Sequence, residues 1–479
     1  MIQSFIHSSE NNNKYIYDDN RRLSVLVHPE LVKAYENSNN TDPYYLKKYT
    51  YLKVHGFFTE PKSADFVIMN ESMVRENIIN AKQIVFETTD SCNLNCTYCA
   101  FGEIYGGYDE RNHKKINIHY AINLLKYIFE QKPKNKNSKL IISFYGGEAL
   151  LNMYFIKRIV EISNKLNIKK ELEIEYSMTT NATLINKYID FLVDNKFSLL
   201  ISLDGNEGNH SYRVFSKNNK NSFHKVVENL NMIQRDYPEY FSTHVNFNAV
   251  LNNRNSVKDI YEFIYTQYHK IPRIAELNKR DVNPNNKDRL ECMFRSIRKS
   301  ESEYLREESY LQRITHSELL LYKDLTNFLK YYSINYYISN LNTLLSVFEK
   351  QLPTSTCTPF FKKIFLTNQN KLLPCERVNY KYSLGKVNES IEIDVPEITR
   401  QYNFYFEHIK KICQNCYAYR FCGLCLFQIN NIDKVDMKEF VCDRFQDQKT
   451  YKNKLYHIFS FLEKFPNDFS EIVENVIYE

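Results

Sequence analysis

Apolar residues along this chain recur with two different periods, and the pattern changes near residue 82. Before that point, two short runs of β-type residues precede two stretches with helical spacing: residues 14–19, 22–27, 28–38 and 42–58. Asp42 followed by Pro43 is typical of a helix start, because aspartate caps the first turn and proline fits its first position. The pattern predicts a small strand–strand–helix–helix module in residues 1–80.

After residue 82, strand-like runs alternate with helix-like runs. The predicted strands are 81–89, 140–146, 172–180, 197–205 and 243–251. The predicted helices between them are 118–131, 154–166, 186–195 and 222–237. Alternation of this kind favours βαβ units and a parallel sheet, whose functional residues lie at the carboxyl ends of the strands.

The rest of the chain has three further parts. A chain of 479 residues is too long for one compact core, so several domains are expected. Residues 278–352 are charged and helical and predict a solvated connector. Residues 353–450 contain short strands, loops and many cysteines, and residues 451–479 predict a closing helix. The predicted division is therefore 1–80, 81–277, 278–352, 353–450 and 451–479.

Composition and charge exclude several classes of protein. The formal net charge is +6, and no basic stripe is interleaved with aromatic residues, so no nucleic-acid partner is expected. The start lacks the apolar segment of a secretory signal, and no run is long enough to span a membrane, so we expect a cytoplasmic protein. In that reducing compartment the 11 cysteines are expected to be thiols or metal ligands.

Ten of those cysteines lie in two groups, and the first follows a predicted strand directly. Cys92, Cys96 and Cys99 have the spacing C-x₃-C-x₂-C, which places three thiolates on one loop. A [4Fe–4S] cluster held by three cysteines keeps one iron open, and that iron can chelate the amino and carboxylate groups of a ligand. The alternative is a zinc site completed by a ligand from elsewhere in the chain.

The stretch "CNLNCTYC" resembles the signature of radical S-adenosylmethionine (SAM) enzymes. The resemblance implies a partial (β/α)6 barrel related to the TIM barrel. It also implies that the open iron binds SAM, and that an electron cleaves SAM to a 5′-deoxyadenosyl radical that removes hydrogen from a C–H bond. By the same resemblance, Tyr98 would lie beside the adenine.

Two later stretches follow the order of motifs in that family. In "YGGEAL", Gly146 and Gly147 would allow close approach of the backbone to a ligand, and Glu148 could accept a hydrogen bond from the SAM ammonium. "TTNATLI" resembles the family's T-N-G stretch, with Ala182 in place of the glycine. Asn181 is then either a polar contact to SAM or substrate, or a helix cap.

The stretch "ISLDGNEGNHSYR" resembles a further family motif. Ser202 and Arg213 match it and are predicted to bind the cofactor, Ser202 through the SAM ribose or carboxylate. Ser211 departs from the usual aspartate. Asp204 and His210 are interpreted as structural, since an aspartate at a strand end often caps a turn.

The second cysteine group resembles the SPASM domain, which holds two auxiliary [4Fe–4S] clusters. The resemblance assigns Cys413, Cys416, Cys422 and Cys442 to a distal cluster, and Cys357, Cys375 and Cys425 to a nearer one with an open corner. The last gap has two residues instead of three, and Asn370 replaces a glycine. Asparagine tolerates a positive φ, so the turn is expected to survive. The alternative is structural zinc on Cys413–Cys425.

Glu376 follows Cys375 directly. In sulfatase-maturating relatives an acidic residue at this position is the base toward the substrate, so Glu376 is the candidate catalytic residue. The alternative is a salt bridge to Arg377 or to a lysine.

The resemblance covers about residues 82–450 and implies a radical SAM/SPASM peptide maturase, like those beside short precursor genes in anaerobic gut bacteria. Residues 1–80 resemble a winged-helix module that would bind the leader of a ribosomally made precursor peptide, and a ferredoxin or flavodoxin would be the reductant. The predicted product is a thioether or carbon–carbon crosslink. The alternatives are formylglycine formation, as in anaerobic sulfatase-maturating enzymes, and a non-catalytic iron–sulfur or zinc scaffold that binds peptides.

Overall fold

The chain folds into two compact units. The computed structural model describes residues 3–21, 23–59, 66–106, 111–135, 138–304, 325, 352–419, 422–464 and 466. Unit 1 comprises Met1–Met69, Leu311–Thr356 and Gln401–Glu479, and unit 2 comprises Asn70–Tyr310 and Cys357–Arg400. Most of the predicted connector and the end of the predicted closing helix lie outside the described residues. No described helix combines the length and apolar content needed to cross a membrane.

Unit 1 begins with a three-stranded antiparallel sheet followed by two helices. Its elements are β1 (Phe5–Ser8), β2 (Lys14–Asp18), β3 (Leu23–Val27), α1 (Pro29–Tyr35) and α2 (Pro43–Val54), and the strand order is β1-β2-β3. Asp42 accepts a hydrogen bond from the Tyr44 amide at 2.8 Å and so caps α2, which confirms the predicted helix start. Strand β1 was not predicted, because four residues are too few to show a period.

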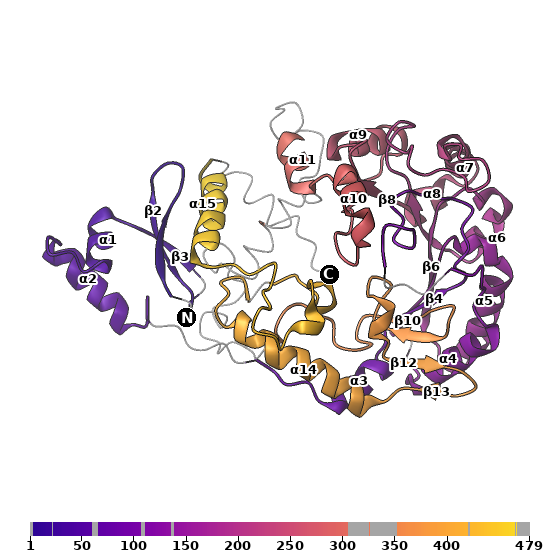
Figure 1. Ribbon diagram of the computed structural model, residues 1–479, viewed down its shortest axis with the longest axis horizontal. Helices are drawn as coiled ribbons and strands as arrows, with labels where there is room; N and C mark the ends of the chain where they lie inside the picture. Colours follow the sequence, from indigo (N-terminus) through magenta and orange to yellow (C-terminus); the bar gives the residue numbers. More distant parts are fainter. Residues whose placement is uncertain are drawn as a thin grey trace. The chain divides into compact units, whose positions relative to one another are not determined.

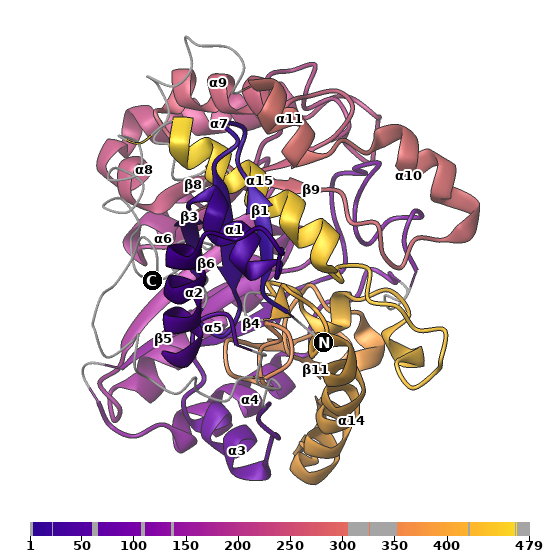
Figure 2. The same cartoon turned by 90° about the vertical axis from the view of Figure 1, so that its left-hand side faces the viewer.

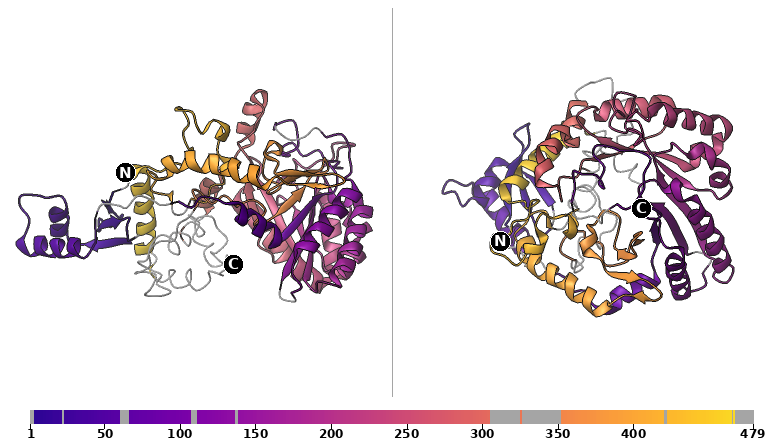
Figure 3. Two further views of the ribbon diagram at one scale, coloured as in Figure 1. Left: turned by 90° about the horizontal axis from the view of Figure 1, so that it is seen from below. Right: turned by 45° about the vertical axis from the view of Figure 1, so that its right-hand side comes forward.

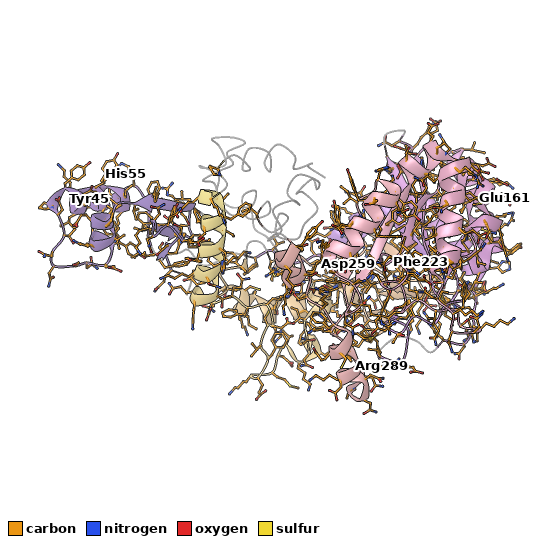
Figure 4. All side chains as sticks on the ribbon, turned by 90° about the horizontal axis from the view of Figure 1, so that it is seen from above. Tyr45, His55, Glu161, Phe223, Asp259 and Arg289 are labelled. Atoms are coloured by element: carbon orange, nitrogen blue, oxygen red, sulfur yellow. The ribbon has the colours of Figure 1, made fainter. Side chains whose placement is uncertain are left out.

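The two faces of this sheet pack against different helices. Ile16 and Val27 pack in one core with Leu31 of α1 and Tyr49 of α2. On the other face, the Tyr15 ring lies 4.6 Å from that of Phe459 in α15 (Gln448–Lys464). Figure 2 shows α15 lying across the sheet, and Figure 4 labels Tyr45 in α2 and His55 at its C-terminal cap. The closing helix therefore completes the N-terminal module.

Unit 2 is built on parallel strands that alternate with helices. The strands are β4 (Gln83–Glu87), β5 (Lys139–Tyr145), β6 (Glu173–Thr180), β7 (Ser198–Ser202), β8 (Val245–Leu251) and β9 (Arg273–Glu276). They pair in parallel in this order, as the six-stranded barrel prediction requires. The fold class is therefore confirmed.

The helices of unit 2 cover the outer side of these strands (Figures 1 and 3). In α4, the buried residues Ala121, Leu124, Leu125, Ile128 and Phe129 form one helical face. The described helices are α3 (Glu71–Ile79), α4 (Ile118–Gln131), α5 (Met153–Asn167), α6 (Ile189–Asp194), α7 (Phe223–Asp236), α8 (Pro238–His244), α9 (Val257–Tyr268), α10 (Lys287–Met293) and α11 (Ile297–Tyr304).

Strands from the predicted cysteine-rich region extend the same sheet. Strand β10 (Ile364–Leu366) pairs in parallel with β4, and β11 (Lys371–Leu373), β12 (Gly385–Val387) and β13 (Ile391–Glu392) continue the sheet in antiparallel pairs. Helix α14 (Val395–Cys413) follows. Short 3₁₀ turns complete the described elements: η1 (Ala149–Asn152), η2 (Ile185–Lys187), η3 (Pro284–Asn286), η6 (Tyr380–Tyr382), η8 (Leu426–Gln428) and η9 (Ile432–Lys434).

The burial of the two faces differs from one parallel strand to another. Phe86 packs its ring 5.7 Å from that of Phe155 in α5, so its face of β4 meets the helices. Along β7, Leu199 and Ile201 are buried, whereas Ser198 and Ser202 are half-buried. Strand β4 is thus buried on both faces from Ile84 to Glu87, whereas the half-buried face of β7 keeps Ser202 accessible at the strand end.

Candidate active site at the carboxyl ends of the parallel strands

The first three cysteines lie on the loop that follows β4. The Asn95 amide donates to the Val214 carbonyl at 2.7 Å, and the Thr97 amide donates to the Tyr212 carbonyl at 3.3 Å. An isolated bridge pairs Leu94 with Phe215. The loop is therefore fixed against the segment 212–215, which comes from beyond β7 and carries Arg213.

The three thiols of this loop lie close to one another in a setting that suits thiolates bound to metal. Burial, the largest effect, raises the pKa of Cys92 to about 11 and that of Cys96 to about 12, and neighbouring thiols of the loop add to both shifts. Bare thiolates would be unfavourable here, and iron would supply the missing positive charge. The Leu94 amide lies 3.4 Å from the Cys92 sulfur and is a ready donor to it. The residues present therefore fit an iron–sulfur cluster.

Gly146 and Gly147 bring the next strand end against this loop. A Cβ on Gly147 would lie 2.1 Å from the Ser91 carbonyl oxygen, and one on Gly146, whose φ is +139°, would lie 2.3 Å from the Thr89 carbonyl oxygen. The Gly147 amide donates to Thr89 at 2.9 Å. The two glycines are thus required by the approach of protein backbone to protein backbone, while their predicted contact with SAM stays a prediction.

Glu148 ties the end of β5 to the end of β6. Its carboxylate accepts from the Thr180 hydroxyl at 2.7 Å, the Asn181 amide at 2.8 Å and the Leu150 amide at 3.1 Å. Burial raises the pKa of Glu148 in spite of these donors. Three of roughly four acceptor positions of the carboxylate are occupied, so at most about one remains for a ligand ammonium.

Asn181 connects β6 to the cysteine loop and also caps its own turn. Its oxygen accepts from the Thr183 amide at 3.0 Å, which is the capping role. Its Nδ2 donates to Asn93 at 2.9 Å and lies 3.8 Å from the Cys92 sulfur. Ala182 has a φ of +62°, which explains why glycine is the family residue there. Ser202 ends β7, and no hydrogen bond of its hydroxyl is seen within the described residues.

Asp204 is the centre of a buried hydrogen-bond network. Arg213 holds it with a bidentate ion pair, Nε to Oδ2 at 2.9 Å and Nη2 to Oδ1 at 3.0 Å. Tyr98 donates its hydroxyl to Asp204, and the Val250 amide donates to it at 2.9 Å. Burial alone would raise the pKa of Asp204, but the Arg213 charge outweighs it and keeps that pKa low. Arg213 therefore orients Tyr98 through Asp204.

His210 has the structural role that the sequence indicated. The Ser222 hydroxyl uses its one hydrogen to donate to the Arg213 carbonyl at 2.9 Å. Ser222 therefore accepts the hydrogen bond from Nε2 of His210, at 3.0 Å. Nδ1 accepts from the Asp204 amide at 3.4 Å. Burial lowers the pKa of His210 to about 4, in agreement with a neutral imidazole protonated on Nε2.

Unit 1 contains a second group of mutually close thiols. Burial, and after it the neighbouring thiols, raises the pKa of Cys413, and the same causes act at Cys422. The Gln446 amide lies 3.4 Å from the Cys416 sulfur. The cysteines that affect one another in this way are the four predicted to share the distal cluster: Cys413, Cys416, Cys422 and Cys442.

No group of three or more cysteine, histidine or acidic side chains among the described residues is arranged around a single ion. Thiolates on separate irons of a cluster lie farther apart than the ligands of one ion. The finding therefore concerns sites for a single zinc ion and leaves the cluster predictions open. Cys357 and Cys375 are half-buried in unit 2, and Cys425 belongs to unit 1. The nearer cluster stays a prediction.

Glu376 forms the salt bridge that the sequence left open as an alternative. Lys363 Nζ lies 2.8 Å and 3.0 Å from its two oxygens. Burial would raise the pKa of Glu376, but the ammonium outweighs it and lowers that pKa, so the carboxylate is ionised at neutral pH.

Asn370 has a φ of +67°, so the predicted turn with asparagine in place of glycine is confirmed.

Two charged residues near the cysteine loop were not predicted. Glu87 ends β4, and burial raises its pKa to about 7. Arg111 Nη2 lies 3.9 Å from the Cys99 sulfur. Glu87 could have been found from the sequence, because a glutamate at the end of an apolar strand is unusual. Arg111 lies in a loop without periodicity, and nothing in the sequence pattern marks it.

Comparison with known proteins agrees with this arrangement. Residues 86–264 match the model of the radical SAM superfamily. The chain is 26% identical over 359 residues to the cysteine-type anaerobic sulfatase-maturating enzyme of Clostridium novyi (strain NT), covering 71% of this chain and 86% of that protein. It is also 26% identical over 219 residues to the radical SAM cyclopropyl synthase TigE of Paramaledivibacter caminithermalis, covering 43% of this chain and 42% of the synthase.

A solved structure has the same fold. The structure of anSMEcpe with bound AdoMet and Cp18Cys peptide aligns with a TM-score of 0.52 and 17% identity, over 83% of this chain and 99% of that one. The matched region contains the three-cysteine loop and every strand-end motif that converges on it. Residues 86–264 therefore form a radical SAM domain, and the chain is an enzyme related to the anaerobic sulfatase-maturating enzymes.

Proposed function

We propose that this chain is a radical SAM/SPASM maturase that crosslinks a ribosomally made precursor peptide. The observation that carries the proposal is the combination of a three-cysteine loop fixed by three strand-end motifs with a second group of four mutually close thiols. Cys92, Cys96 and Cys99 would hold a [4Fe–4S] cluster with SAM, which supplies the radical that removes hydrogen from the peptide. Auxiliary clusters on the SPASM cysteines would accept the electron released when the crosslink forms.

The residues around the loop have defined roles in this proposal. Tyr98, held by Asp204, would support the adenine, and Ser202 would bind the ribose or carboxylate. Glu148 would use its remaining acceptor position for the SAM ammonium. Glu376, kept ionised by Lys363, would accept a proton from the substrate.

The N-terminal module is the proposed site for the leader peptide. Its three-stranded sheet has its own core with α1 and α2, and strands β1 and β3 are the edge strands of the order β1-β2-β3. An extended peptide can add to such an edge through backbone hydrogen bonds. A ferredoxin or flavodoxin would supply electrons, and reduced thiols of this kind suit a cytoplasmic enzyme.

Formylglycine formation is the second candidate function. The similarity to a cysteine-type anaerobic sulfatase-maturating enzyme and the acidic Glu376 directly after Cys375 favour it. The non-catalytic scaffold is set aside, because the curated relatives with the same motifs are named as enzymes.

Mass spectrometry after anaerobic co-expression separates these functions. The probes are each short peptide that sequencing finds encoded beside this gene, and the Cp18Cys peptide, with the Cys92→Ala/Cys96→Ala/Cys99→Ala variant as control. We expect the neighbouring peptide to lose two hydrogens per modified site, only with intact cysteines, and to resist fragmentation between the joined residues. An aldehyde on Cp18Cys that reacts with hydrazine, with the neighbouring peptide unchanged, would instead establish formylglycine formation.

A further inference from the structure

Arg111 places a positive charge next to the cysteine loop from outside every motif of the sequence signature. Its Nη2 lies 3.9 Å from the Cys99 sulfur, within the range of an N–H···S hydrogen bond. Its guanidinium also stands over the Phe101 ring, 4.5 Å from the centroid. A sulfur on one side and an aromatic face on the other hold the side chain in one orientation.

The backbone fixes Arg111 as firmly as its side chain does. The segment after it runs antiparallel to the residues that lead into the cysteine loop, with a bridge between Thr89 and Lys115. The Asn112 amide donates to the Asp90 carboxylate at 3.0 Å, and the Asp90 amide donates to the Lys114 carbonyl at 3.2 Å. Arg111 therefore enters the site at a position set by paired backbone.

Within the described residues no carboxylate is seen to hold Arg111 with two hydrogen bonds, in contrast to Arg213, which Asp204 holds in this way. The Nε of Arg111 is buried without a hydrogen-bond partner among the described residues. Its Nη2 lies 3.9 Å from the Cys99 sulfur, so the thiolate of Cys99 is the group toward which this guanidinium directs its charge.

We propose that Arg111 is a positioning residue that stabilises the cluster-bearing thiolates and raises the reduction potential of the cluster they hold. A cation and an N–H donor beside a ligating sulfur favour the state with the additional electron, and both are known to tune such clusters. The potential then lies closer to that of the physiological reductant. The proposal rests on the cluster assigned to Cys92, Cys96 and Cys99, not on the identity of the peptide.

The test is an anaerobic redox titration of the reconstituted holoprotein, followed by electron paramagnetic resonance, with sodium dithionite as reductant. The variants are Arg111→Gln and Arg111→Lys. The matched control is Arg254→Gln, because Arg254 stacks on Tyr212 at 3.6 Å in the same unit and no contact of it with a cysteine is seen within the described residues. Subtracting the spectrum of the Cys92→Ala/Cys96→Ala/Cys99→Ala variant removes the auxiliary signals.

We expect the midpoint potential to become more negative in both Arg111 variants, more so with Gln than with Lys, and to stay at the wild-type value in Arg254→Gln. A wild-type potential in Arg111→Gln at full iron content would overturn the proposal. If Arg111→Gln binds less iron, Arg111→Lys decides by the same criterion. Wild-type protein that takes up no iron on this loop would count against the proposed function itself, which separates the two failures.

Discussion

Two buried carboxylates in unit 2 have opposite pKa shifts. Glu87 ends β4 with 2% of its surface exposed, and Asp204 follows β7 with 0% exposed. Burial raises the pKa of Glu87 to about 7, whereas Arg213 overcomes burial and lowers the pKa of Asp204. Glu87 accepts from the Asn368 amide at 3.1 Å, whereas Asp204 receives both arms of a guanidinium. Equal burial therefore does not give equal ionisation.

The third buried carboxylate of the site shows which partner matters. Glu148 accepts three hydrogen bonds from neutral donors, and its pKa is still raised by burial. Neutral donors offset desolvation only in part, whereas a guanidinium at hydrogen-bond distance reverses it. Asp204, which accepts the hydrogen bond of Tyr98, is thus charged at neutral pH. Glu87, at the point where β4 leads into the cysteine loop, is the carboxylate that can gain or lose a proton near neutral pH.

The largest effect is expected when the ion pair is broken. Asp204→Asn leaves Arg213 buried without its counter-ion, which costs about 3–5 kcal/mol in the free energy of unfolding. The change also weakens the support of Tyr98, so SAM binding is expected to fall with stability. Urea unfolding followed by circular dichroism, under anaerobic conditions, measures the first effect, and equilibrium dialysis with labelled SAM measures the second.

The surface pair between Asp236 and Arg235 provides the control. Asp236→Asn removes an exposed carboxylate from a 2.7 Å contact, and no measurable loss is expected. If Asp204→Asn lowers the free energy of unfolding by less than about 1 kcal/mol, water or other polar groups compensate the charge of Arg213. The contrast between charged and neutral partners would then no longer explain the pKa difference.

The next effect concerns Glu87 and has the opposite sign. In the folded protein Glu87 keeps its proton up to a pH of about 7, whereas in the unfolded chain it ionises near 4.5. Between these values the folded state binds more protons, so stability falls as the pH rises. The shift corresponds to about 3 kcal/mol, because one pKa unit is about 1.4 kcal/mol.

Glu87→Gln removes that dependence and keeps an oxygen for the Asn368 amide. The variant is expected to be more stable than wild type by about 3 kcal/mol at pH 8 and nearly equal to it at pH 4.5. Urea midpoints across this pH range measure the difference, with the exposed Glu239→Gln as control. A constant difference between variant and wild type at all pH values would mean that Glu87 does not titrate in this range.

The sequence predicted those helices and strands that are long enough to show a regular spacing of apolar residues. Residues 118–131 were predicted as a helix and form α4 at the same positions, and five parallel strands were placed within a few residues. Strands β1 and β9 were missed, and the short strands expected in residues 353–450 were not placed one by one, because two to four residues show no alternation. Helix α9 has the same apolar spacing as α4, with Ile260 and Ile264 buried one turn apart, and could have been predicted.

For the site, the sequence identified motifs but not the contacts between them. Spacing alone located the three cysteines and the two glycines, because these features are local. The role of Asp204 was underestimated, since its hydrogen bond with Tyr98 joins residues 106 positions apart. Arg111 has no local signature at all. Long-range pairing of charges is set by the fold, and a single sequence contains no pattern for it.

The smallest effect tests the neutral donors of Glu148. Thr180→Val removes the hydroxyl that donates to Glu148 at 2.7 Å and accepts from the Ala182 amide at 3.0 Å, with little change of shape. A buried amide then loses its partner, at a cost of about 2 kcal/mol. With one donor fewer, the pKa of Glu148 rises further.

The exposed Thr243→Val, whose hydroxyl donates to the Glu239 carbonyl at 2.8 Å, is the matched control and is expected to unfold like wild type. A loss in Thr180→Val as large as that in Asp204→Asn would mean that neutral hydroxyls hold these carboxylates as strongly as a guanidinium does, and the distinction between the two kinds of partner would fall.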